Sequence, residues 1–131
     1  MDAQLRRFIR DRAGDRCEYC LVPQAALKMP LQVEHIIAVQ HQGESNPDNL
    51  ALACDRCNLY KGTNLSSVDP QSGQITRLFD PRRDAWTEHF SLLDDTILGI
   101  TPTGRATVRL LQFNADNRVR LRRLLMLTGQ W

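Results

Sequence analysis

The chain has 131 residues, a length that fits one domain with a hydrophobic core of ordinary size. Seventeen basic and fifteen acidic residues leave a net charge of +2, so bulk charge neither demands nor excludes a nucleic-acid partner. The N-terminal segment is charged and amphipathic, and no later stretch approaches the roughly 20 apolar residues of a membrane span. We therefore expect one cytoplasmic domain over residues 1–131, without membrane contact.

The N-terminal half predicts a helix, a strand and a loop. Apolar residues recur at helical spacing between Leu5 and Ala13, and Gly14 follows where a helix commonly ends, so we expect a helix from Asp2 to Ala13. The sequence LQVEHIIAV, residues 31–39, suits a short β-strand. Residues 41–49 are rich in turn-forming types and predict a loop.

The segment NLALACDRCNLYKGTN, residues 49–64, contains a short apolar run. We expect it to become helical after its second cysteine and to end near Gly62. The polar residues 66–74 predict a connector. Residues 89–100 predict two short strands that join around Asp94 and Asp95.

Two helices are expected at the C-terminal end. Thr101 followed by Pro102 is typical of an N-cap with proline at the first helical position, which predicts a helix through Asn114. Asn114 or Asp116 could cap a last helix through residues 117–129.

Two CxxC pairs, Cys17 with Cys20 and Cys54 with Cys57, have the spacing that lets the sulfurs of a turn reach one tetrahedral Zn²⁺. Two pairs complete one site, and a closed Cys₄ site leaves no open coordination position, so this zinc is expected to be structural. Four unliganded buried cysteines and a redox pair are the weaker alternatives.

Between and beside the cysteine pairs lie Glu34, His35, Asn49 and Asn58. The pattern CEYC, VEHIIAV, DNL and CDRCNLYKG resembles the HNH endonuclease motif in its small bacterial four-cysteine, His-Asn-Asn form, over a motif core of residues 16–62. The C-terminal extension, residues 75–131, also resembles the segment that follows the motif in such proteins, with no chemistry assigned to it.

The resemblance implies an α+β fold with a ββα-metal core (treble-clef-like, His-Me finger), clamped by the Cys₄ zinc site and surrounded by an N-terminal helix and a C-terminal hairpin with helices. It implies that Glu34 and Asn58 hold a catalytic Mg²⁺ or Mn²⁺, that His35 is the general base, and that Asn49 holds the loop against the strand. The substrate it implies is DNA, whose phosphodiester bonds would be hydrolysed.

The chemistry of phosphodiester hydrolysis independently favours a similar set of residues. A hard cation with oxygen ligands stabilises the charge that develops on a phosphoryl group, and an imidazole is the natural base near neutral pH. Adjacent strand residues point to opposite faces, so Glu34 and His35 can serve one phosphate only if the strand twists or ends there. We therefore expect irregular backbone at this point.

Several residues keep two interpretations. Many HNH relatives have aspartate before the histidine, where this chain has Glu34, and some have a third metal-binding histidine. His89 could supply it or could pack beside its aromatic neighbours, and His41 is expected to be a solvated loop residue. Lys61 is expected to be exposed past the helix start, as a phosphate contact or a solubilising lysine.

Basic side chains are the candidate contacts to the DNA backbone. Arg56 and Arg105 are tentative substrate-binding residues together with Lys61. The arginines of the C-terminal half could neutralise phosphates or could form a solvated helix face; they are Arg82, Arg83, Arg105, Arg118, Arg120, Arg122 and Arg123.

A rival interpretation is a zinc-stabilised nucleic-acid-binding module without catalysis. Such a module has no need of an acidic residue beside a histidine, or of an asparagine directly after the last cysteine. The sequence does not distinguish DNA from RNA, a nick from a double-strand break, or one oligomeric state from another.

Overall fold

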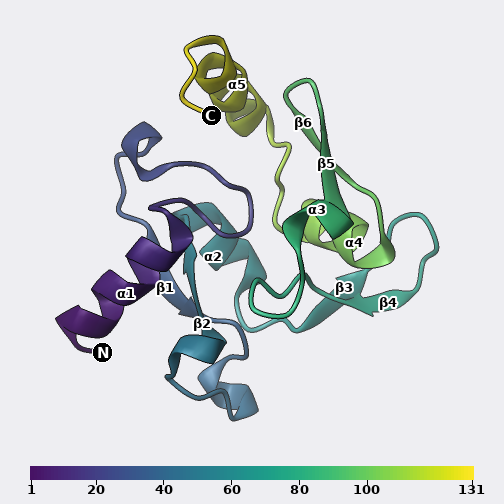
Figure 1. Ribbon diagram of the computed structural model, residues 1–131. Helices are drawn as coiled ribbons and strands as arrows, with labels where there is room; N and C mark the ends of the chain where they lie inside the picture. The colour runs from purple at the N-terminus through teal and green to yellow at the C-terminus, as the bar shows by residue number, and fades with distance from the viewer. The chain divides into compact units, whose positions relative to one another are not determined.

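The computed structural model describes residues 1–131, which form two compact units, Met1–Thr63 and Asn64–Trp131. Helices and strands are interspersed along the chain, and the strands form three separate two-stranded sheets (Figure 1). The expected mixture of helix and strand is therefore confirmed. Each unit is described by itself below.

The first unit begins with α1, Ala3–Ala13, as predicted. The Asp2 carboxylate accepts a hydrogen bond from the backbone N–H of Leu5 at 2.7 Å and so caps the helix. Gly14 ends the helix in the left-handed region, with φ at 65°, where a residue without Cβ carries no steric cost. Short 3₁₀ turns follow elsewhere in this unit, at Gln24–Ala26, Val39–His41 and Pro47–Asn49.

Strands β1, Gln32–His35, and β2, Leu50–Ala53, form an antiparallel hairpin. The strand predicted for residues 31–39 is wrong in its length, because the chain bends directly after His35. Glu34 and His35 themselves are in regular register with Ala51 and Leu50, and the irregular backbone expected there begins only at Ile36. β2 was not predicted as a strand: its four residues are all buried, and such a run lacks the alternation that marks a half-exposed strand.

Helix α2, Asp55–Lys61, starts inside the second cysteine pair rather than after it. Cys54 is its N-cap, and the sulfur accepts a hydrogen bond from the N–H of Cys57 at 3.4 Å. The helix ends before Gly62, as predicted. The β1–β2 hairpin contacts both α1 and α2, so the two helices and the hairpin share one small core.

Two hairpins belong to the second unit. The expected connector is wrong: β3, Ser66–Val68, pairs with β4, Ile75–Arg77. The second hairpin, β5, Phe90–Leu93, with β6, Thr96–Gly99, confirms the predicted strands and their turn.

Three helices complete the second unit. α3, Trp86–His89, was not predicted, whereas α4, Pro102–Leu110, begins after the predicted Thr101 cap and ends earlier than Asn114. α5, Asp116–Leu127, follows Ala115, which caps it without a side-chain bond, so both predicted caps of this helix are wrong.

Candidate functional site

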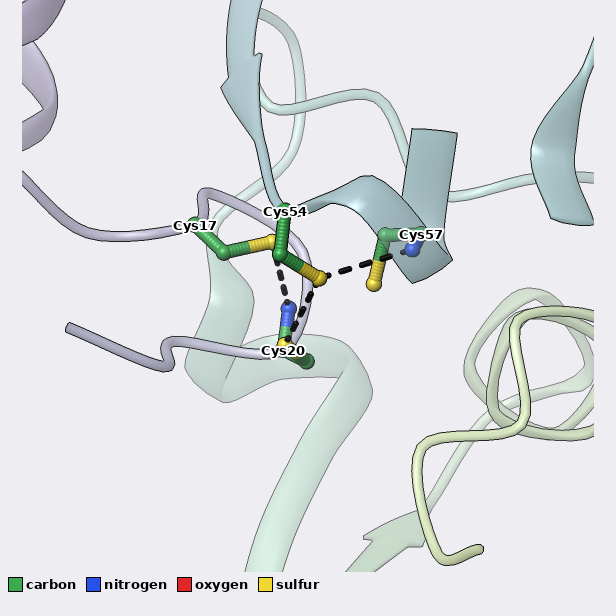
Figure 2. Close-up of side chains that lie close together, drawn as sticks. All are labelled: Cys17, Cys20, Cys54 and Cys57. Atoms are coloured by element: carbon green, nitrogen blue, oxygen red, sulfur yellow. Dashed lines mark hydrogen bonds between the residues drawn. The ribbon is translucent and has the colours of Figure 1, made fainter. Parts of the chain in front are cut away.

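The four cysteines of the first unit lie together, as Figure 2 shows. Their sulfurs all lie within 4.8 Å of one another, and all four residues are buried. The sulfurs of Cys20 and Cys54 are 3.8 Å apart, close to the edge of about 3.8 Å that a tetrahedron with Zn–S bonds of about 2.3 Å would have. The residues therefore fit a four-coordinate zinc ion.

Backbone geometry supports this reading. In the first pair the sulfur of Cys17 accepts a hydrogen bond from the N–H of Cys20, and the second pair repeats that bond (Figure 2). Burial raises the pKa of the Cys17 thiol well above its ordinary value. A cation is therefore needed if this residue is to lie in the interior as a thiolate.

The two sides of β1 carry different chemistry. The Glu34 side chain lies on the side that α2 contacts, and Tyr19 and Lys61 bind it there: the Tyr19 hydroxyl donates to Oε1, and the Lys61 ammonium lies 3.3 Å from Oε2. Burial raises the pKa of Glu34, while the positive charge of Lys61 acts in the opposite direction. Glu34 is thus a buried carboxylate with a charged partner.

Lys61 is only 2% exposed, so the prediction that it is exposed is wrong. Its long side chain extends from the last turn of α2, and its ammonium donates to the backbone oxygens of His35 at 3.3 Å and Ile36 at 2.8 Å. A phosphate contact by Lys61 would require the ammonium to leave these oxygens.

Asn58 is also on the side of α2 that contacts β1. Its Nδ2 donates to Oε1 of Gln32 at 2.6 Å, and Gln32 lies on the same face of β1 as Glu34 because side chains two positions apart in a strand share a face. The structure therefore brings Glu34 and Asn58 to the same side of the hairpin.

His35 projects from the other face of β1. It pairs with Leu50 across the hairpin, is partly exposed, and its Nε2 lies 2.8 Å from the hydroxyl oxygen of Ser45 in the following loop. His35 and the Glu34 carboxylate are therefore neighbours in sequence whose side chains have separate partners.

Asn49 fastens the loop that follows His35. Its Oδ1 accepts from the N–H of Ile37 at 2.9 Å, and its Nδ2 donates to the carbonyl oxygens of Ile37 at 3.0 Å and Glu44 at 2.8 Å. Gly43 permits this closure, because a Cβ there would lie 1.7 Å from the Ile37 carbonyl oxygen. The loop is thus held at the residues next to the imidazole.

The other predicted contacts have the following surroundings. Arg56 lies over the ring of Tyr60 at 5.7 Å on α2. The Nε2 of His41 donates to the carbonyl oxygen of Thr63 at 3.1 Å. In the second unit, Arg105 forms two hydrogen bonds with the buried Asp69, at 2.9 and 3.0 Å.

The second unit also uses other candidate residues internally. His89 lies 2.7 Å from the hydroxyl of Thr101 and packs edge-on against Phe79, in agreement with its packing interpretation. Arg122 is buried and donates to the carbonyl oxygen of Phe113 at 2.8 Å, so neither the phosphate contact nor the solvated helix face considered for it fits this residue.

Three residues near the site were missed by the sequence analysis: Tyr19, Gln32 and Ser45. Gln32 stands two positions before Glu34 and so had a detectable signal, a polar residue on the same strand face. Tyr19 lies inside the first CxxC pair, and the cysteine spacing predicts nothing about the residues between the two sulfurs. The contact of Ser45 with His35 depends on loop closure and has no signal in the sequence.

Comparison with known proteins agrees with this geometry. Residues 17–64 match the family model of the HNH endonucleases, and the match includes all four cysteines. The segment around the four cysteines is therefore similar to an HNH endonuclease domain. No curated protein and no solved structure matches the chain. None of its helices has both the length and the apolar character needed to cross a bilayer.

Proposed function

We propose that this protein is a metal-dependent endonuclease that hydrolyses the phosphodiester bonds of DNA. In this proposal β1, β2 and α2 form a ββα-metal core, the Cys₄ zinc stabilises it, and both units of the chain belong to one nuclease. The family match supports the class of reaction. The residues that the match contains supply a base, an oxygen ligand set and a fixed loop.

His35 is the proposed general base. The observation that carries this assignment is the Asn49 clamp, which binds both backbone groups of Ile37 two residues after the histidine. Because the strand end and the loop are both held, the partly exposed imidazole has a fixed backbone, and its Nε2 lies 2.8 Å from the Ser45 hydroxyl oxygen. A neutral imidazole can accept a proton from water, and such bases contribute on the order of 10²- to 10⁴-fold in rate.

Glu34 and Asn58 are the proposed ligands of the catalytic ion. A carboxylate and an amide oxygen are donors that Mg²⁺ and Mn²⁺ accept, and a bound ion of this kind would stabilise charge on the phosphoryl oxygens. Asn58 uses its Nδ2 on Gln32, which leaves Oδ1 as a donor to a cation. The chemistry of the set therefore fits, with the condition that the Lys61 ammonium gives up Glu34.

The proposed contacts to the DNA backbone are Arg56, Lys61 and Arg105, as point charges or forked donors to phosphate. The Arg56 guanidinium lies over the ring of Tyr60 on α2, which is the segment that also carries Asn58. Arg105 would have to exchange its bonds with the Asp69 carboxylate for bonds with phosphate.

The direct test is plasmid cleavage with Mg²⁺ or Mn²⁺ by the zinc-loaded full chain and by His35→Ala. We expect cleavage by the wild type and a loss of about 10²-fold or more in the variant, with zinc content and folding unchanged. His41→Ala is the matched control, because it removes a second imidazole of the same unit that has no role in the proposal. Equal cleavage by wild type and His35→Ala would end the assignment of His35.

One observation favours a second candidate, a zinc-stabilised nucleic-acid-binding module without catalysis. The Glu34 carboxylate is buried and already paired with the Lys61 ammonium, as in a purely structural ion pair. If this candidate is correct, the wild type binds DNA in Mg²⁺ but leaves plasmid uncut. Glu34→Gln then changes the stability of the protein, and the plasmid stays uncut.

A further inference from the structure

The chain contains two lysines, and they have opposite environments. Lys28 is exposed, whereas Lys61 is buried with three oxygen atoms around its ammonium. These oxygens belong to the Glu34 carboxylate at 3.3 Å, the His35 carbonyl at 3.3 Å and the Ile36 carbonyl at 2.8 Å. An ammonium has three N–H donors, so this set of acceptors satisfies it.

The same oxygens are of the kinds that could bind a metal cation. A carboxylate oxygen and backbone carbonyl oxygens are ligands that hard divalent ions use in proteins. An ammonium and a divalent ion that both lie against the Glu34 carboxylate repel each other, and this repulsion is strong at short distance in a buried region. Loading of an ion at Glu34 and departure of Lys61 are therefore linked events.

The two α2 side chains involved in this exchange lie close together on the helix. Asn58 and Lys61 are three positions apart on α2, a spacing that places them on the same side of the helix. The lysine ammonium ends a flexible four-carbon chain, so it can leave while the helix backbone stays in place. The Asn58 amide already reaches the same strand, where its Nδ2 donates to Gln32, two positions before Glu34.

We propose that Lys61 is an internal cation that occupies the Glu34 site in the metal-free protein, and that binding of a divalent ion at Glu34 and Asn58 releases its ammonium to solvent. This inference rests on the proposed function and deepens it. Released Lys61 becomes available to a substrate phosphate only in the metal-loaded protein. The same side chain thereby neutralises the buried carboxylate before the ion arrives.

The test follows the reactivity of the two lysines in the zinc-loaded full chain. Acetic anhydride labels accessible amines, and peptide mass spectrometry then quantifies acetylation at Lys28 and Lys61 with and without Mg²⁺ or Mn²⁺. We expect Lys28 to react equally in all conditions. Lys61 should be protected without the divalent ion and should lose that protection as the ion is titrated in. Protection of Lys61 that persists at saturating Mg²⁺ and Mn²⁺ would overturn the proposal.

Metal binding gives a second readout that does not depend on cleavage. We expect Lys61→Met to bind Mn²⁺ at least about tenfold more tightly, as measured by electron paramagnetic resonance of free Mn²⁺, because a competing positive charge is gone. Lys28→Met is the matched control and should leave Mn²⁺ affinity unchanged. Unaltered or weaker Mn²⁺ binding by folded Lys61→Met would contradict competition between the Lys61 ammonium and the ion. If this variant does not fold, the acetylation of the wild type tests the proposal.

The two levels of the proposal fail in different ways. If the wild type cuts plasmid through His35 while Lys61 stays protected, the exchange is wrong and the nuclease assignment stands. If Mg²⁺ releases Lys61 but plasmid remains uncut, the ion exchange stands and the nuclease assignment fails.

Discussion

Asn49 in the first unit and Asn114 in the second make the same pair of hydrogen bonds, but the two pairs hold different kinds of structure. Each side chain accepts from the N–H of an isoleucine and donates to the carbonyl oxygen of that residue: Asn49 with Ile37, and Asn114 with Ile97. Ile97 is 0% exposed, whereas Ile37 is 39% exposed. The second clamp therefore closes a core, while the first fixes an exposed loop next to His35.

The surroundings of the two clamps explain this difference. The second unit has a cluster of aromatic rings, in which Phe90 contacts Phe79 at 5.2 Å and Phe113 at 5.5 Å between ring centroids. The first unit instead has the cysteine cluster beside its hairpin. A zinc ion held by this cluster would stabilise the first unit in place of a larger apolar core, so that polar side chains could remain at the surface.

Removal of zinc is expected to have the largest effect and to separate the two clamps. Structural zinc contributes on the order of 10 kcal/mol to the folding of small zinc domains, so a strong chelator should unfold the first unit and abolish any cleavage. Trp86 and Trp131 both belong to the second unit. Their near-ultraviolet dichroism should persist while zinc is released; loss of both signals together would show that the two units fold as one.

Phe90→Ala is the reverse experiment, directed at the aromatic core. Phe90 is 1% exposed, and its truncation is expected to cost about 3–5 kcal/mol of unfolding free energy in the second unit. Urea unfolding followed by tryptophan fluorescence measures this cost. Zinc content should be unchanged, and a variant that also loses its zinc would contradict the independence of the two cores.

Asn49→Ala and Asn114→Ala compare the clamps directly. Removal of the side-chain amide leaves backbone groups of an isoleucine without partners, at a cost of about 1–3 kcal/mol where these groups are buried. We expect Asn114→Ala to lower stability more, because Ile97 is buried, and Asn49→Ala to lower cleavage more, because the loop beside His35 loosens. Thermal melts and plasmid assays on both variants test this expectation. It is refuted if one variant shows both the larger loss of stability and the larger loss of cleavage.

Arg123→Ala should have the smallest effect, at an exposed ion pair of α5 with Asp95 at 2.6 Å. The Arg123 guanidinium lowers the pKa of the Asp95 carboxyl. A lowered pKa stabilises the folded protein above the ordinary value of about 4, and this contribution is lost as the pH falls through the lowered pKa. The difference between wild type and variant should therefore be largest near neutral pH and vanish in acid, as a series of thermal melts can check.

Local signals accounted for much of the fold. The end of α1 at Gly14 and the N-cap of α4 at Thr101 were predicted because these residues act on backbone groups within a few residues. The β5–β6 hairpin also followed from alternation around a turn. In contrast, β2 escaped prediction because it is buried throughout, and the cap of α5 was misassigned because Asn114 binds Ile97 instead.

The sequence by itself determined the chemistry present: four cysteines at zinc spacing, a glutamate beside a histidine, and two asparagines in the order of the HNH motif. Only the tertiary structure decided how these groups are used. It placed Glu34 and His35 on opposite faces of β1 and buried Lys61 against the carboxylate. The reason is that spacing along a chain specifies which atoms are near in sequence, whereas burial and ion pairing depend on helices and loops that arrive from elsewhere.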